Sequence, residues 1–395
     1  MPEARAARDE TRRSCEGGSL APFARRARGF ARVLVLFVAA TLGSPAHGPI
    51  VAAHAAGSPG GTPLPQARLP ARANLAAQAS PATPAQPVAP TPPRATIPGF
   101  HSPPPNSDTS VSGVVRAAPA HMPFYTATKG TTTIYVLGTL HIGDPSDYPP
   151  NAPFRRPILA ALAASPTLAL ELSPDDLIES QDDVSRYGVC SYACLPRLLP
   201  DPLWRKLAAR LQNNPAALEE IKKTRPWLAA LLVETYDSLN AGLQTEYGTE
   251  AQLQNVYFRT RGKVVGLETL AEQMRAFTNL TLAEQREMLA QDLEQTPAQN
   301  VADVKELHRL WRAGDADAIA AWATAKSERL ARTEWTARAL DNRIVYDRNR
   351  RFTARMLLIA APNRPVFVAI GALHLGGPKG VLALLRTHGF VVEAN

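Results

Sequence analysis

Residues 131–144 read TTTIYVLGTLHIGD, and this stretch sets the frame of the fold. Its first seven residues are almost all β-branched, aromatic or aliphatic, which predicts a buried strand over 131–137. Gly138 and His141 follow at the carboxyl end of that strand. In open α/β sheets, ligands and catalytic groups collect at this end of the strands. His141 is therefore a candidate site residue.

The same frame occurs a second time near the end of the chain. Residues 368–377 read VAIGALHLGG and complete an apolar strand predicted over 366–370, with Gly371 and His374 in the matching places. A glycine lets backbone or ligand approach closely, and imidazole is both a common metal ligand and the usual general base near neutral pH. Residues 121–395 contain only five histidines, so two in one frame indicate a shared site rather than coincidence.

Two further apolar strands are predicted between these frames, over 167–172 (TLALEL) and 262–267 (GKVVGL), and a last one over 390–393. A helix over 153–164 connects the first two strands, which predicts a right-handed crossover and a parallel pair. Helices are expected within 198–260 and over 282–293, 302–313, 316–330, 336–359 and 380–388. The sequence thus predicts an α/β or α+β fold, with a mixed sheet built from both ends of the domain and a helical insertion between them.

Two glutamates occupy positions like those of the histidines. Glu171 lies at the end of the second strand, and Glu268 directly follows the third. A carboxylate there is costly unless it is paired or bound to a cation. With His141 and His374, these residues form a ligand set suited to Mn²⁺, Zn²⁺ or Fe²⁺, which would activate a water for hydrolysis. The alternative for either glutamate is a salt bridge to an arginine of the long helix.

That helix, over 336–359, contains Arg348 and Asn349 shortly before the second Gly-x-x-His frame. Arg348 is placed to clamp a carboxylate or to stabilise developing negative charge, and the alternative is a solvated basic face. His308 is expected on a helix surface. His388 precedes Gly389 and is expected to end a helix, where a cation is favourable.

Other catalytic signatures are absent from the sequence. There is no Gly-x-Ser-x-Gly elbow, P-loop or Rossmann glycine fingerprint. Cys190 and Cys194 are spaced for a short-loop disulfide in an oxidising compartment, and no second ligand pair lies nearby to complete a zinc knuckle.

The first third of the chain is unlike the rest. Residues 1–55 contain an arginine-rich stretch, the apolar run 33–42 and an Ala-His-Ala site, the order of a signal peptide. Residues 56–120 hold 15 prolines and one aromatic residue, which predicts a disordered linker. Residues 121–395 form the folded domain. We expect a periplasmic or secreted protein with no transmembrane segment in the mature chain.

Charge argues against a nucleic-acid partner. Residues 1–120 contain 12 arginines and 5 acidic residues, out of 43 basic and 35 acidic residues in the whole chain. The domain therefore retains 31 basic and 30 acidic residues. No basic face with interleaved aromatics is visible in it, so we expect no nucleic-acid binding.

Five segments occur together in an order that resembles the TraB/GumN family, which includes the Tiki proteins: YVLGTLHIGD, LALELSPDD, KVVGLETLAEQ, DRNRRFTARM and the block from Gly371 to Glu393. The resemblance spans nearly all of residues 130–395. It implies that His141, His374, Glu171, Glu268, Arg348 and Asn349 belong to an active site. It also implies a divalent metal, Mn²⁺, Co²⁺ or Zn²⁺, because Tiki members are metal-dependent proteases.

Two hypotheses follow from different classes of function. The first is an exported, metal-dependent hydrolase of peptide or protein substrates. In it the histidines and one glutamate hold the metal, the other glutamate is the base, and Arg348 assists the oxyanion. The alternative is a non-catalytic binding or regulatory protein of the cell envelope, suggested by the pheromone-inhibition role of TraB relatives. A third, weaker reading is an esterase-like activity with the same residues and no metal.

Overall fold

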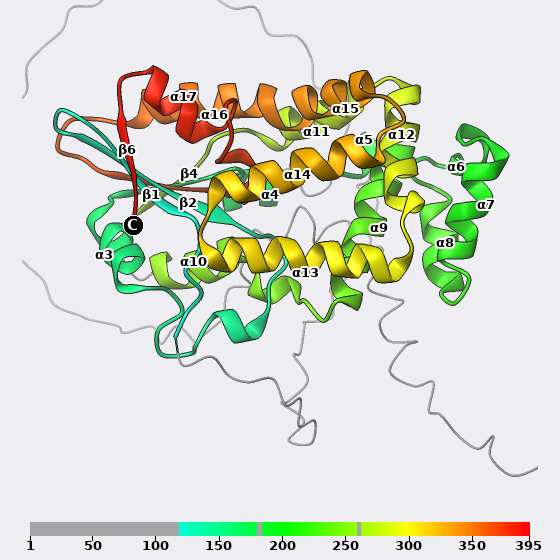
Figure 1. Cartoon of the computed structure of the whole chain (residues 1–395), viewed down its shortest axis with the longest axis horizontal. Helices are drawn as coiled ribbons and strands as arrows, with labels where there is room; N and C mark the ends of the chain where they lie inside the picture. Colours follow the sequence, from blue (N-terminus) through cyan, green and yellow to red (C-terminus); the bar gives the residue numbers. More distant parts are fainter. Residues whose placement is uncertain (1–117, 180–183, 259–261) are drawn as a thin grey trace, which may run out of the picture. The chain divides into compact units, whose positions relative to one another are not determined.

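A six-stranded mixed sheet forms the centre of the computed structural model, which describes residues 118–179, 184–258 and 262–395 (Figure 1). The predicted leader, and the predicted linker up to residue 117, lie outside these residues. The strands are β1 (Phe124–Lys129), β2 (Thr132–Thr139), β3 (Thr167–Leu170), β4 (Lys263–Gly266), β5 (Val366–Gly371) and β6 (Val391–Ala394). The mixed sheet confirms the predicted fold class.

The order of the strands explains where a site can form. It is β4-β3-β5-β2-β1-β6, so the first and last thirds of the domain interleave. β4, β3, β5 and β2 run parallel, whereas β1 is antiparallel to β2 and β6. The carboxyl ends of the four parallel strands therefore lie along one edge of the sheet.

Helices cover both faces of the sheet, and the central strand β5 shows why. Val366, Val368 and Ile370 belong to the core on one face, and Phe367 and Ala369 belong to the core on the other. A strand buried on both faces is apolar at every position rather than alternating. The first face packs against α16 (Asp347–Ile359) and α17 (Val381–Thr387), and the second against α3 (Arg156–Ala164), α10 (Thr249–Tyr257) and α13 (Pro297–Ala313).

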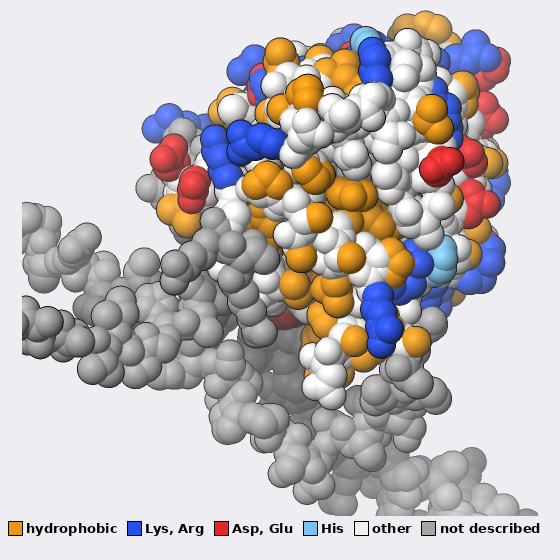
Figure 2. Space-filling view, turned by 90° about the vertical axis from the view of Figure 1, so that its left-hand side faces the viewer, with side chains coloured by type: hydrophobic (Ala, Val, Ile, Leu, Met, Phe, Trp, Pro, Cys, Tyr) orange, Lys and Arg blue, Asp and Glu red, His pale blue; other side chains and the backbone are white. Residues whose placement is uncertain are grey.

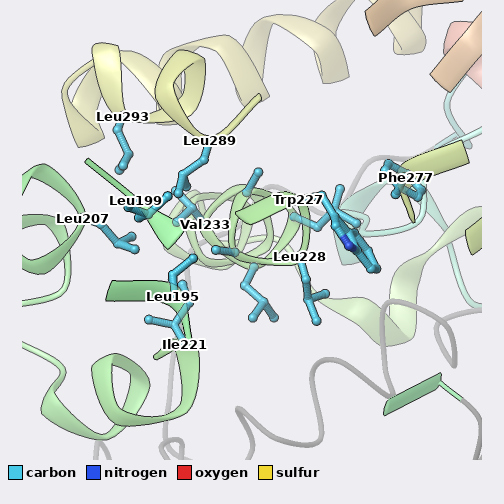
Figure 3. Close-up of a cluster of buried hydrophobic side chains, with 14 of the residues drawn as sticks. Leu195, Leu199, Leu207, Ile221, Trp227, Leu228, Val233, Phe277, Leu289 and Leu293 are labelled. Atoms are coloured by element: carbon cyan, nitrogen blue, oxygen red, sulfur yellow. The ribbon is translucent and has the colours of Figure 1, made fainter. Parts of the chain in front are cut away.

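The helical insertion has a core of its own (Figure 3). Trp227 stacks on Phe277 with ring centroids 5.3 Å apart, and leucines fill the remaining space. The helices around this core are α7 (Asp201–Arg210), α8 (Pro215–Ile221), α9 (Pro226–Asn240), α11 (Leu270–Thr278) and α12 (Leu282–Glu294). The insertion is thus packed around an apolar cluster of its own and is not a long loop.

Further helices and helical turns complete the fold. The remaining α-helices are α4 (Pro174–Glu179), α5 (Val184–Gly188), α6 (Leu195–Leu198), α14 (Ala316–Leu330) and α15 (Glu334–Asp341). Single turns of other helix types are η1 (Pro145–Asp147), η2 (Thr245–Tyr247), the π-helical η4 (Asn342–Tyr346) and η5 (Ala372–His374). Cys190 and Cys194, shortly after α5, form a disulfide in the structure.

Three sequence-based expectations about the elements need correction. β2 and β3 are parallel, as predicted, but they are not neighbours, because β5 inserts between them. The helix predicted over 336–359 begins earlier and is interrupted by η4. β1 and α11 were not predicted. β1 has no clear alternation of apolar residues, whereas α11 does have the signals of a helix, with Leu270, Met274 and Phe277 on one face and a capping box at Thr269.

His308 was expected on a helix surface, and that prediction is wrong. Its residue surface is only 4% exposed, and its ring lies 6.3 Å from that of Trp311 on the same helix. α13 packs against the sheet along this face, so a polar residue of the helix is covered there. Burial lowers the pKa of His308 to about 4. His388 is the C-cap of α17, as expected.

On the face shown in Figure 2, hydrophobic side chains gather in a band with small groups of Lys and Arg around it. Among the described residues, none of the helices combines the length and apolar character that crossing a membrane requires.

Candidate functional site

The predicted site residues gather at the carboxyl ends of the parallel strands. Thr139 pairs with Gly371 at the last position of the β2–β5 ladder, which brings the two Gly-x-x-His frames side by side. Glu171 follows β3 directly, and the backbone N–H of Glu268 donates to the Glu171 carbonyl over 2.9 Å. The parallel register thus places both glutamates and both frames at one edge of the sheet.

Arg348 lies at the centre of this cluster. Its Nη2 donates to Glu171 Oε2 over 2.5 Å and to Glu268 Oε1 over 2.6 Å, and its Nε donates to Glu268 Oε1 over 3.1 Å. The side chains of Arg348, Glu171 and Glu268 are 7%, 5% and 0% exposed. The expected alternative, a salt bridge from each glutamate to the long helix, is therefore what the structure contains, and one arginine serves both.

The helix that supplies Arg348 contains a local irregularity. The π-helical turn η4 lies directly before α16, and Arg348 is the second residue of α16. A π-helical turn shifts the helix face that follows it, and such turns are frequent at functional sites. Beyond this turn, α16 buries Arg348, Asn349 and Phe352. If η4 were a regular α-helical turn, Arg348 would lie on a different face of the helix. The π-helical turn therefore helps to direct Arg348 toward the strand ends.

His374 is held as a neutral imidazole of one tautomer. The Asn349 amide donates to the Lys379 carbonyl over 2.9 Å, which leaves its Oδ1 to accept from His374 Nδ1 at 2.6 Å. The opposite nitrogen, Nε2, then accepts from Arg348 Nη1 at 3.2 Å. Burial and the positive charge of Arg348 lower the pKa of His374 to about 3. The ring therefore accepts a hydrogen bond from Arg348 and stays uncharged at neutral pH.

The two glutamates differ although they share an arginine. Burial alone would raise the pKa of Glu171, but Arg348 and the backbone N–H of Gly371, 2.7 Å from Oε1, contribute to lowering it to about 2. Burial raises the pKa of Glu268 in spite of the attraction of Arg348. Glu171 is accordingly the carboxylate that the cluster holds most firmly in the ionised form.

A third glutamate completes the site, and sequence reasoning missed it. Glu250, on α10, accepts from Thr139 Oγ1 over 2.5 Å and lies 3.0 Å from His141 Nδ1. Burial would lower the pKa of His141, but the Glu250 carboxylate outweighs it and raises this pKa to about 9. Within the cluster, His141 keeps the most exposed side chain, at 34%. No apolar strand precedes Glu250, so the signal that revealed the other two glutamates is absent there.

Gly371 leaves a small space between the catalytic candidates. A Cβ at this residue would lie 3.1 Å from Glu171 Oε1, 3.5 Å from His374 Cδ2 and 4.0 Å from His141 Nε2. The missing side chain therefore keeps open the position that all three groups face. Because Nδ1 of His141 is directed to Glu250, Nε2 is the nitrogen directed toward this space.

Three of the four predicted metal ligands surround a cation that the protein itself supplies. Glu171 Oε2, Glu268 Oε1 and His374 Nε2 converge on the guanidinium of Arg348, so a divalent ion at their centre would have to displace it. In the described parts of the chain, no group of three or more His, Cys, Asp or Glu side chains is arranged to hold a metal. Three of the four predicted ligands are engaged by Arg348 and the fourth, His141, is paired with Glu250, so as arranged they do not fit a metal.

The structure thus brings together all six predicted site residues and adds Thr139 and Glu250. Phe352 packs beneath them, with its ring centroid 5.2 Å from both the Arg348 guanidinium and the His374 ring. Arg348 was expected to clamp a carboxylate or to stabilise developing negative charge, with a solvated basic face as the alternative. It is buried, and its guanidinium binds the carboxylates of Glu171 and Glu268 and contacts His374.

Comparisons with known proteins show the family of the chain. Searches against curated proteins and against solved structures gave no match. The model of the TraB/PrgY/gumN family matches residues 123–394, which include every strand of the sheet and every residue of the cluster. The chain therefore belongs to the TraB/PrgY/gumN family.

Proposed function

We propose that the chain is exported and hydrolyses a peptide bond of a peptide or protein substrate, with His141 as the group that transfers the proton. The observation that supports this proposal is the His141–Glu250 pair, which directs Nε2 toward the space above Gly371. A carboxylate on one imidazole nitrogen fixes the ring and stabilises the imidazolium that forms when the other nitrogen takes a proton. In this cluster the carboxylate is Glu250 and the imidazole is His141, which has the most exposed side chain of the cluster.

The residues divide the work as follows. Neutral His141 takes a proton from water at Nε2 while the water oxygen attacks the carbonyl carbon. The imidazolium then gives that proton to the departing amine nitrogen as the C–N bond breaks. Glu171 Oε1 faces the same space and accepts a hydrogen bond from the water, which orients it. Arg348 keeps Glu171 ionised. Asn349 and Arg348 hold His374 in place as a neutral imidazole beside the reacting groups.

A digest of a peptide library by the full chain tests this function. Mass spectrometry should reveal cleaved peptides, and the same digest with a chelator tests the divalent metal, which stays a prediction. Cleavage that persists in the presence of the chelator would support a mechanism in which His141 and Glu171 act without a metal. Retention of a peptide without any cleavage would instead support the binding or regulatory alternative.

The pH dependence of turnover is the first specific prediction. His141 must lose its proton to act as base, so kcat/KM should rise about tenfold per pH unit below its pKa and level off above about pH 9. In Glu250→Gln the carboxylate that raises this pKa is gone, so the midpoint should move to lower pH and the plateau should fall. The exposed Glu246→Gln is the matched control. If Glu250→Gln leaves the pH profile of kcat/KM unchanged, His141 is not the base that the profile reports.

Gly371→Ala tests the space itself. The backbone of Gly371 has φ −49°, which any residue adopts, so alanine should fold without backbone strain. Its methyl group would occupy the position 3.1 Å from Glu171 Oε1 and exclude the attacking water. We expect turnover to fall at least tenfold with a nearly unchanged melting temperature. Full activity in this variant would place the reacting water elsewhere.

A further inference from the structure

A cavity lies near Glu268, and the mechanism proposed for His141 does not use it. Its volume is about 260 Å³, near the lower end for small-molecule sites. It is lined by Glu272, Arg275, Ala276, Asn279, Arg343, Asp347 and Arg351. These residues come from α11, η4 and α16, the same helix run that supplies Arg348.

Arg351 connects the cavity to the site. It lines the cavity, and its Nη2 lies 3.7 Å from Glu268 Oε2. Its Nε is buried and has no hydrogen-bond partner among the described residues. The guanidinium is therefore not fully fixed by the protein, and its side chain is 38% exposed. A ligand in the cavity would contact the residue that touches the catalytic cluster.

The positive charges of the cavity are only partly compensated. Glu272 is already paired with Arg355, whose Nη2 lies 2.7 Å from Oε1, and Asp347 is paired with Arg350. Arg343 donates from Nη1 to the Asn279 carbonyl over 3.2 Å, and its Nε lies 3.4 Å from Glu284 Oε1. Within the described residues, the Arg275 side chain makes no hydrogen bond or ion pair with any other. Three guanidinium groups thus line the cavity, and its two acidic residues are paired with arginines that do not line it.

We propose that this cavity binds a carboxylate of the substrate while the scissile bond lies at His141. Guanidinium groups bind planar carboxylates through two parallel hydrogen bonds. Arg343 and Arg351 each lie near a glutamate outside the lining, so Arg275 is the one lining guanidinium without an ion pair among the described residues. One uncompensated positive charge matches a singly charged carboxylate and disfavours a doubly charged phosphate. This proposal rests on the proposed peptidase function, because it takes the bound carboxylate to be part of the substrate. Binding of a carboxylate to the cavity can nevertheless be measured without any cleavage.

Binding of small probes to the full chain tests the proposal. The probes are acetyl-Ala-Ala-Ala with a free carboxylate, the same tripeptide as an amide, acetyl-Ala-Ala-Glu-amide and inorganic phosphate. Ligand-observed NMR reports binding whether or not cleavage occurs, so failure of the peptidase function leaves the result readable. At least one carboxylate peptide should bind about tenfold more tightly than the neutral amide, as expected for a charge-assisted hydrogen bond. Comparing the first and third probes distinguishes a chain terminus from an acidic side chain.

Exposed variants locate the effect. Arg275→Gln and Arg343→Gln should each remove most of the preference for the carboxylate, whereas Arg275→Lys should keep part of it. Arg338→Gln, an arginine of α15 that is 69% exposed and outside the cavity, is the control. Equal binding of acid and amide, an unchanged preference in both glutamine variants, or tighter binding of phosphate than of either carboxylate peptide would overturn the proposal.

Discussion

His141→Gln should lower kcat/KM by about 10²–10⁴-fold, the range that a positioned general base contributes. Glutamine retains a polar group of similar size beside Glu250, but it has no nitrogen that takes up a proton near neutral pH. His141 is 34% exposed, so the fold does not depend on burying its ring. Turnover should therefore fall while the melting temperature of the variant stays close to that of the wild type.

Two comparisons make this result specific. His388→Gln, at the C-cap of α17, removes a histidine outside the cluster and should leave turnover unchanged. Glu250→Gln should be less damaging than His141→Gln, because it removes the group that orients the base but not the base. An active His141→Gln variant, measured on the peptide that the wild type cleaves best, would refute the proposed mechanism.

Arg348→Met should produce the largest loss of stability. Methionine fills similar volume but leaves Glu171 and Glu268 buried without their common cation. Breaking a buried ion pair by removing one partner costs about 3–5 kcal/mol, because a buried charge is then uncompensated. Urea denaturation of the full chain should show this loss as a lower midpoint. Arg350→Met, two residues along α16 and 62% exposed, should cost far less.

The loss should be recovered when the stranded charges are removed. Adding Glu171→Gln and Glu268→Gln to Arg348→Met should restore much of the stability, since neutral amides cost less to bury than carboxylates. If the triple variant is no more stable than Arg348→Met, the loss arises from packing and not from charge.

The pH dependence of unfolding gives an independent check. In the wild type the pKa of Glu171 is lowered from 4.5 to about 2, so its contribution is complete above pH 4.5 and is lost as pH falls toward 2. In Arg348→Met, burial without the cation should raise this pKa instead. The variant should then lose less stability than the wild type as the solution is acidified over that interval.

The strands and the position of the site could be predicted from the sequence. Apolar runs with glycine at their ends mark β2, β3, β4 and β5 because a strand buried on both faces must be apolar throughout. In a parallel sheet, residues that follow such strands meet at one edge. That rule alone was sufficient to bring His141, His374, Glu171 and Glu268 together.

Other features depend on which strands pair and where the helices pack. β5 lies between β2 and β3, an order that no local pattern encodes, because strand pairing is decided by the whole sheet. The burial of His308 has the same origin. A helix surface looks alike in the sequence whether it faces solvent or another element, so only the packing of α13 decides it.

The sequence by itself determined the fold class, the four strand ends and the residues that gather there, because strand burial and backbone geometry are written in local patterns. The tertiary structure decided what those residues do to one another. Glu250 meets Thr139 across 111 positions of sequence, and Arg348 meets Glu171 across 177. Such pairings depend on how α10 and α16 pack against the sheet, and they keep His374 neutral, keep Glu171 ionised and raise the pKa of His141.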